Sequence, residues 1–275
     1  MAINPINSNT GEFESSQING VWMQHAIEVI YGTYGDVVSV QDKDKDLLKF
    51  GRTEEVQTAK TTIMANKTGI YNETYVSTNV IDTLSSSAVA DTEPVTVEGH
   101  TVDGSGNFTF IVQSTTLTGR NKVVLTTPLA RMTRIYNTGA SDLVGTVYGY
   151  QETAITNGVP IDGTKVHIVI PINLNQSEKC STTISNNDYW LITSIRGGVI
   201  EKTLNYGDFH LEVRLKGGVF RDVQDFTAGS GSDGGYKFEP YLIIPPNADV
   251  RLRAVSSANG KEMSGSIQGI LATVV

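Results

Sequence analysis

Apolar and polar residues alternate in short runs along most of this chain, and clusters of Gly, Asn, Asp and Ser separate the runs. Runs of this length, bounded by turn-forming residues, predict β-strands. About a dozen strands are expected between Pro94 and the C-terminus. They cover residues 95–97, 108–112, 123–125, 131–136, 144–150, 166–170, 189–195, 209–215, 241–244, 250–255 and 266–274.

The alternation is clearest in residues 210–215 and 250–255, which predict strands with one buried and one polar face. The residues expected on the buried faces are Leu211, Val213 and Leu215 in the first strand and Val250, Leu252 and Ala254 in the second. No amphipathic window of helix length falls between the strands. We therefore expect a mainly β protein with a β-sandwich or jelly-roll-like body over 95–275, and a division of that body near residue 160 stays open.

The first 35 residues depart from this pattern and predict a short helical or extended N-terminal arm. Ser15, Ser16 or Asn19 could cap a helix over residues 21–34. Its apolar stripe could pack on its own domain or reach a neighbouring subunit. The stripe, which is the candidate partner-binding element, consists of Trp22, Ala26, Val29 and Ile30.

Residues 36–94 predict an extended, partly irregular segment, because apolar positions there show little periodicity. Near its start, Asp42, Asp44 and Asp46 have the spacing of a calcium-binding loop. That loop also requires Gly where Leu47 stands and Glu where Thr53 stands. We therefore expect a solvated charged turn and no metal site.

Composition supports the β prediction and narrows the class of protein. Charged residues make up 18% of the 275 residues, below the roughly 25% of an average domain, and Thr, Ser, Asn and Gly fill the difference. The net charge of −8 argues against nucleic acid as the main partner. Because the chain has neither a membrane-spanning apolar run nor a signal-peptide pattern, we expect a soluble protein without a membrane partner.

No catalytic motif emerges from the potentially reactive residues. His25, His100, His167 and His210 are scattered without metal-ligand spacing. The single cysteine, Cys180, excludes an internal disulfide and has no histidine near it in sequence. We therefore expect no enzyme activity, no catalytic residues, no metal and no cofactor.

Three further patterns have a structural and a functional interpretation. The G-x-G-x-x-G match at 229–234 lacks a strand-to-helix context and predicts a flexible hairpin tip. Asp222 and Asp225 could act as a carboxylate pair, but nothing in the sequence places them in a cleft, so surface charges are expected. Aromatic residues among polar ones could form a glycan-binding face, although core packing is favoured. These aromatic residues are Tyr148, Tyr150, Tyr189 and Trp190.

Several segments together resemble a family of uncharacterised virion proteins from marine tailed bacteriophages. The segments are VTVEGH at 95–100 with the strands that continue to residue 125, TTPLAR at 126–131, LVGTVY at 143–148, NQSEKC at 175–180, YWLIT at 189–193, VRLKGGVFR at 213–221 and PNADVR at 246–251. The resemblance implies a structural role in the virion, on or against the capsid, and it brings no catalytic motif.

The resulting hypothesis is a capsid decoration or cement protein of a phage head, assembled in the host cytoplasm and located in the virion. It would form homo-oligomers, with a trimer preferred, and contact other capsid proteins. An alternative is a tail or fibre module that binds a host-surface glycan. A third possibility, the major capsid protein, ranks lower because that shell fold is expected to contain a long helix.

Overall fold

The computed structural model describes residues 45–56, 58–63, 75–200 and 205–273. Within these ranges the chain forms β-strands and one 3₁₀ turn, η1 (Gly163–Lys165), which confirms the mainly β, sandwich-type prediction. No described helix is long and apolar enough to cross a bilayer. Several predicted positions lie outside the described residues, namely Trp22, Ala26, Val29 and Ile30 of the arm and Asp42 and Asp44 of the charged turn.

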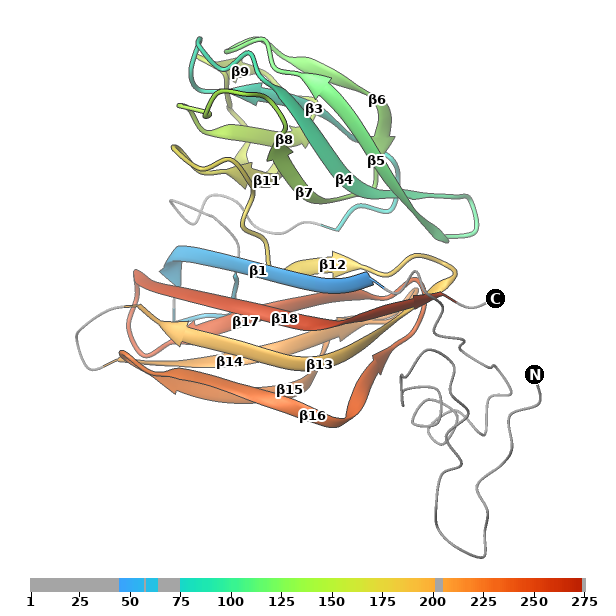
Figure 1. The fold of residues 1–275 in the computed structure, drawn as a ribbon, viewed down its shortest axis with the longest axis vertical. Coiled ribbons are helices and arrows are strands. Elements are labelled where there is room, and N and C mark those ends of the chain that lie inside the picture. Colours follow the sequence, from blue (N-terminus) through green and yellow to red (C-terminus); the bar gives the residue numbers. More distant parts are fainter. Residues whose placement is uncertain (1–44, 57, 64–74, 201–204, 274–275) are drawn as a thin grey trace, which may run out of the picture.

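Two β-sandwiches are stacked along the long axis of the molecule (Figure 1). From β1 (Lys45–Val56) onward, the described chain lies first in one sandwich, crosses to the other and returns. The inserted sandwich contains β3 (Ile81–Ser86), β4 (Pro94–Val102), β5 (Phe108–Thr116), β6 (Val123–Leu129), β7 (Arg131–Asn137), β8 (Val147–Gln151), β9 (Ile155–Thr156), β10 (Val159–Pro160) and β11 (Val166–Ile170). The terminal sandwich contains β1 (Lys45–Val56), β2 (Thr61–Thr62), β12 (Ser181–Thr183), β13 (Asp188–Val199), β14 (Tyr206–Arg214), β15 (Arg221–Gly229), β16 (Asp233–Ile244), β17 (Asp249–Ser256) and β18 (Lys261–Thr273).

Each sandwich is made of two principal sheets. In the inserted sandwich, the sheet β11-β8-β3-β6 packs against the sheet β5-β4-β7. In the terminal sandwich, β1-β18-β13-β16 packs against β12-β17-β14-β15, and β2 pairs with β17. The long strands pair in antiparallel fashion, which allows each sheet one buried and one outer face.

The described strands show where the chain passes between the sandwiches. The chain leaves the inserted sandwich after β11 and enters β12 at Ser181, and the sequence left a division near residue 160 open. Part of the segment expected to be irregular forms β1, β2 and β3. β1 has a partner along nearly its whole length in β18, and this pairing, rather than local periodicity, makes its charged start a strand.

Each sandwich has its own hydrophobic core, and burial of each large apolar side chain contributes about 1.5–3 kcal/mol. In the terminal sandwich, Phe209 stacks on Phe226 with 5.0 Å between the ring centroids. The predicted alternation of β14 and β17 is borne out at the buried residues Leu211, Val213, Val250, Leu252 and Ala254. Leu215 is instead 56% exposed, because β14 ends one residue before it.

A buried ion-pair network joins the two sandwiches. Nε of Arg131 in β7 donates to Oδ1 of Asp249 in β17 at 2.8 Å, and Nε of Arg214 in β14 donates to Oδ2 at 3.0 Å. Thr183 donates to the same carboxylate at 2.6 Å. Burial raises the pKa of Asp249, but the hydrogen bond and charge of Arg131, with the charge of Arg214, outweigh burial and hold the pKa below its ordinary value. The carboxylate therefore stays ionised and links the bodies.

A candidate ligand-binding groove

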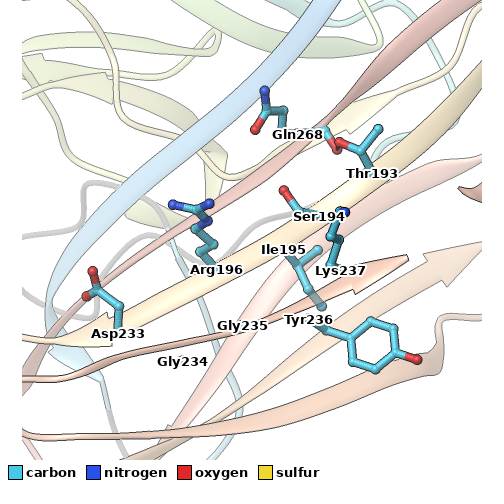
Figure 2. A pocket seen from close by; sticks show the side chains of 10 residues that line it. All are labelled: Thr193, Ser194, Ile195, Arg196, Asp233, Gly234, Gly235, Tyr236, Lys237 and Gln268. Carbon is cyan, nitrogen blue, oxygen red and sulfur yellow. Dashed lines mark hydrogen bonds between the residues drawn. The ribbon is translucent and has the colours of Figure 1, made fainter. Parts of the chain in front are cut away.

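The outer face of the sheet β1-β18-β13-β16 contains a hollow surrounded by polar side chains (Figure 2). Ile195 of β13 is buried in the core, so its neighbours Ser194 and Arg196 point to the solvent side. Ser194 pairs with Lys237 of β16 and with Gln268 of β18. Because cross-strand partners share a face, these three side chains form a polar row across the sheet.

An irregularity in strand pairing accompanies the hollow. β13 and β16 are in register on both sides of Thr193, but the register shifts there, and residues 238–241 of β16 have no partner on β13. A bulge of this kind bends the strand and disrupts the regular face of the sheet. The hollow has a volume of about 520 Å³. It is lined by Thr193, Ser194, Ile195, Arg196, Asp233, Gly234, Gly235, Tyr236, Lys237 and Gln268.

Glycine is required in the strand that borders the hollow. A Cβ on Gly235 would lie 2.5 Å from the backbone oxygen of Ile195, closer than non-bonded atoms approach. The same Cβ would lie 3.3 Å from Cγ of Arg196, so the missing side chain also leaves Arg196 uncovered. Glycine in a strand interior often marks a place where a ligand or another chain comes close.

Positive and negative groups balance around the groove. Within the described chain, Arg196 and Asp233 have no hydrogen-bond or ion-pair partner, and they lie at the same end of the groove. Lys237 donates to Glu239, and this hydrogen bond raises the pKa of Lys237 and lowers the pKa of Glu239. Two basic side chains, Arg196 and Lys237, thus stand beside two acidic ones, Asp233 and Glu239, so the formal charges around the groove balance.

A second, smaller hollow continues across the same face and shares Arg196 and Asp233 with the groove. Small residues of β13 and β18 line it, including Gly198, Ser264 and Ser266. The ring of Tyr236 points away from Arg196 (Figure 2) and contacts Phe238 with 4.9 Å between centroids. The face is therefore polar and open rather than aromatic.

Two of the described histidines are buried away from the groove. His100 is 3% exposed, and its Nδ1 has no hydrogen-bond partner within the described chain. Burial, reinforced by the charge of Lys49, lowers the pKa of His100 to about 3. His167 is also buried, and its Nε2 lies 2.8 Å from Nε2 of Gln151. The environment of both residues is that of structural histidines.

Cys180 is buried as well. Its thiol donates to the backbone oxygen of Lys49 at 3.6 Å, and the side chain is fully enclosed in the core of the terminal sandwich. A nucleophile must reach its substrate, and this thiol is covered.

The third described histidine, His210, lies in an acidic cluster that the sequence analysis did not identify. Pairing of β14 with β15 places it beside Asp222 and Asp225, with Nδ1 2.9 Å from Oδ1 of Asp225 and 3.9 Å from Oδ2 of Asp222. This trio has the residue types and spacing of a metal site. Lys60 already donates to both oxygens of Asp222 at 2.6 Å, so an ammonium group occupies the side on which a cation would be held.

The four aromatic residues considered for a glycan-binding face do not form one. Trp190 is fully buried in the core of the terminal sandwich, and Tyr148 and Tyr150 are buried in the inserted sandwich. Tyr189 is partly buried and packs in a small cluster with Leu191. The preference for core packing is confirmed at these positions.

The polar groove was not predicted from the sequence. Its one sequence signal is the G-x-G-x-x-G match, which forms the turn between β15 and β16 and supplies Asp233 and Gly234. In that turn, Ser232 donates its backbone N–H to the oxygen of Gly229 at 3.1 Å, and Gly231 has a φ of 70°. The segment is therefore a tight, hydrogen-bonded turn.

No family model and no curated protein matches this chain. Among solved structures, the infectious bursal disease virus Gt strain aligns over 91% of this chain and 77% of that chain, at 12% identity and a TM-score of 0.21. The Gx strain aligns over the same shares, at 11% identity and a TM-score of 0.23. The CBM22-1-CBM22-2 tandem domain of Paenibacillus barcinonensis Xyn10C aligns over 86% of this chain and 96% of that chain, at 13% identity and a TM-score of 0.24. TM-scores this low carry no argument about function.

Proposed function

We propose that this chain is a non-enzymatic structural protein of a tailed-phage virion that decorates and stabilises the head. The observation that carries the proposal is the extent of the virion-protein resemblance. Its segments fall on strands of both sandwiches, from VTVEGH in β4 to PNADVR around the start of β17. The resemblance therefore extends over parts of both bodies.

The architecture is suited to such a role. A shell protein must keep its shape while it packs against many neighbours, and here a buried carboxylate bound by two arginines ties the two sandwiches together. His100, His167 and Cys180 have the environments of structural residues, and Lys60 occupies the side of the His210 cluster on which a cation would be held. We accordingly propose that the chain carries out no reaction and requires no metal or cofactor.

We further propose that residues 1–34 attach the protein to the shell. A helix shorter than about 12–15 residues is marginal by itself in water, so a stripe of this length gains stability by burial against another surface. Burial of Trp22, Val29 and Ile30 would contribute about 1.5–3 kcal/mol each. In a symmetric oligomer, several identical arms would bind the shell at once, so the oligomer would attach more tightly than a single arm.

Sedimentation with phage heads tests the proposal. The full chain should co-sediment with purified DNA-free heads, whereas a chain without residues 1–34 should stay in the supernatant and keep its β-sheet circular dichroism spectrum. Trp22→Ala should weaken attachment, and Trp190→Phe, a change in the core of the terminal sandwich, should leave it intact. Failure of the full chain to sediment with heads, or equal sedimentation of the truncated chain, would exclude this mode of attachment.

A second candidate function is that of a tail or fibre module that binds a surface glycan. The groove on the β13-β16-β18 face is the specific observation in its favour, because it contains polar groups that have no partner within the described chain. A fibre module should be absent from purified heads and present in purified tails, so the same sedimentation experiment separates the two candidates.

A further inference from the structure

We propose that the groove on the β13-β16-β18 face binds an uncharged sugar chain, with Arg196 and Asp233 as its main hydrogen-bonding groups. The inference rests on glycan recognition, the second candidate function, and gives it a site and a ligand class. It is independent of head attachment through residues 1–34, because the groove and that segment are different parts of the chain.

The donors and acceptors of the groove match the chemistry of sugar hydroxyls. A hydroxyl donates one hydrogen bond and accepts others, so a sugar needs both kinds of partner close together. Arg196 supplies donors that no described residue uses, and Asp233 supplies unused acceptors at the same end of the groove. Gln268 offers both kinds of group from β18.

The charge balance identifies the ligand as neutral. Arg196 and Lys237 are offset by Asp233 and Glu239, so the groove has no net field to attract an anion or a cation. A strongly acidic glycan would be drawn to Arg196 but repelled by the neighbouring Asp233 carboxylate. An apolar ligand would find a polar lining made of side chains such as Ser194, Lys237 and Gln268.

The glycine and serine residues of the groove leave space for a sugar ring to approach the sheet. Gly235 carries no Cβ beside Arg196, and Gly198, Ser264 and Ser266 extend the shallow surface into the second hollow. A linear chain of sugars could thus lie across β13, with several residues in contact. Because the groove is open to water, each hydrogen bond gains little, and we expect weak binding with a Kd of about 0.1–1 mM per site.

Titration of the full chain with neutral and acidic hexasaccharides tests the inference. The probes are cellohexaose, maltohexaose and mannohexaose, with hexagalacturonate as the charged counterpart, and binding is followed by calorimetry and by NMR shifts. We expect at least one neutral chain to bind, with an affinity that changes less than about twofold between low and high salt. Arg196→Gln and Asp233→Asn should each weaken that binding about tenfold.

Matched variants distinguish the groove from other surfaces. Ser194→Tyr places a bulky ring on the outer face of β13 and should abolish binding, whereas Thr109→Tyr on exposed β5 should have no effect. Arg221→Gln, an exposed arginine on β15 in the opposite sheet, should also bind like the unmodified chain. Binding of hexagalacturonate alone with steep salt dependence, binding unaffected by Ser194→Tyr, or the absence of binding to all four probes would each overturn the inference. None of these outcomes would affect the head-attachment result.

Discussion

His100 and Lys49 show how single residues set the pH dependence of this fold. The folded protein keeps His100 neutral, since burial and the charge of Lys49 lower its pKa to about 3, whereas the unfolded chain takes up a proton near pH 6.5. The stability that this residue contributes is therefore complete above pH 6.5 and is lost as the pH falls toward 3. Between pH 7 and pH 5 we expect a loss of about 2 kcal/mol in the free energy of unfolding from this residue. Urea titrations at pH 7 and pH 5 measure the free energy of unfolding, and its loss between these pH values should be about 2 kcal/mol smaller in His100→Gln. An equal loss in both proteins would contradict the lowered pKa of His100.

Lys49 provides the opposite case, a buried cation that costs stability. Burial lowers its pKa to about 8, partly offset by the charge of Glu98, whereas the unfolded chain keeps the proton up to about pH 10.5. The cost to the folded state is complete below pH 8 and is relieved as the pH rises toward 10.5. Lys49→Met should therefore raise the free energy of unfolding by about 1–3 kcal/mol at pH 7, and the gain should shrink by pH 10. Lys216→Met, at an exposed site, should change it by less than about 0.5 kcal/mol. A destabilised Lys49→Met protein would show that the ammonium group has a compensating partner.

At the scale of strands and turns, alternating apolar and polar residues correctly predict strands that have one buried and one solvent-exposed face. The runs at 210–215 and 250–255 correspond to β14 and β17 because their period of two follows the pleat. β3 belongs to the segment 36–94, which the sequence predicts to be extended and partly irregular, yet it lies in the middle of a sheet. Ser85 is buried there and donates to the backbone oxygen of Gly158 at 2.7 Å. A serine can therefore be buried within a strand when the folded chain provides a hydrogen-bond acceptor for its hydroxyl group.

The groove could not be predicted for a related reason. It depends on a shift of register at Thr193 and on which side chains of β13, β16 and β18 then share a face. These strands lie far apart in sequence, and no local pattern records their register. The His210 cluster was missed in the same way, because only the pairing of β14 with β15 brings it together.

The junction between the sandwiches is the element that we expect to be most sensitive to mutation. Asp249→Ala leaves Arg131 and Arg214 as buried charges without their carboxylate, so the free energy of unfolding should fall by about 3–5 kcal/mol. Glu152→Ala removes an exposed partner of Lys122 and should cost less than about 1 kcal/mol. Chemical denaturation followed by circular dichroism measures both changes. Equal costs for the two variants would mean that the junction does not hold the bodies together.

At the scale of the whole molecule, the described residues form a body of β-strands with several sheet edges, which is suited to packing in closed rings. Edge strands such as β5 and β16 present backbone groups on one side, and symmetric contacts between copies can cover them. We expect the purified full chain to form a trimer, measured by light scattering and by native mass spectrometry over a range of concentrations. A monomer at all concentrations, also when bound to the particle, would contradict this expectation.

Electron cryomicroscopy of intact virions most directly tests the proposal that this chain decorates the phage head. We expect density for two stacked β-sandwiches on the outer surface of the capsid, repeated at local three-fold or six-fold positions, with residues 1–34 in contact with the shell. Density for this fold confined to the tail or its fibres, or its absence from the head surface, would contradict the claim.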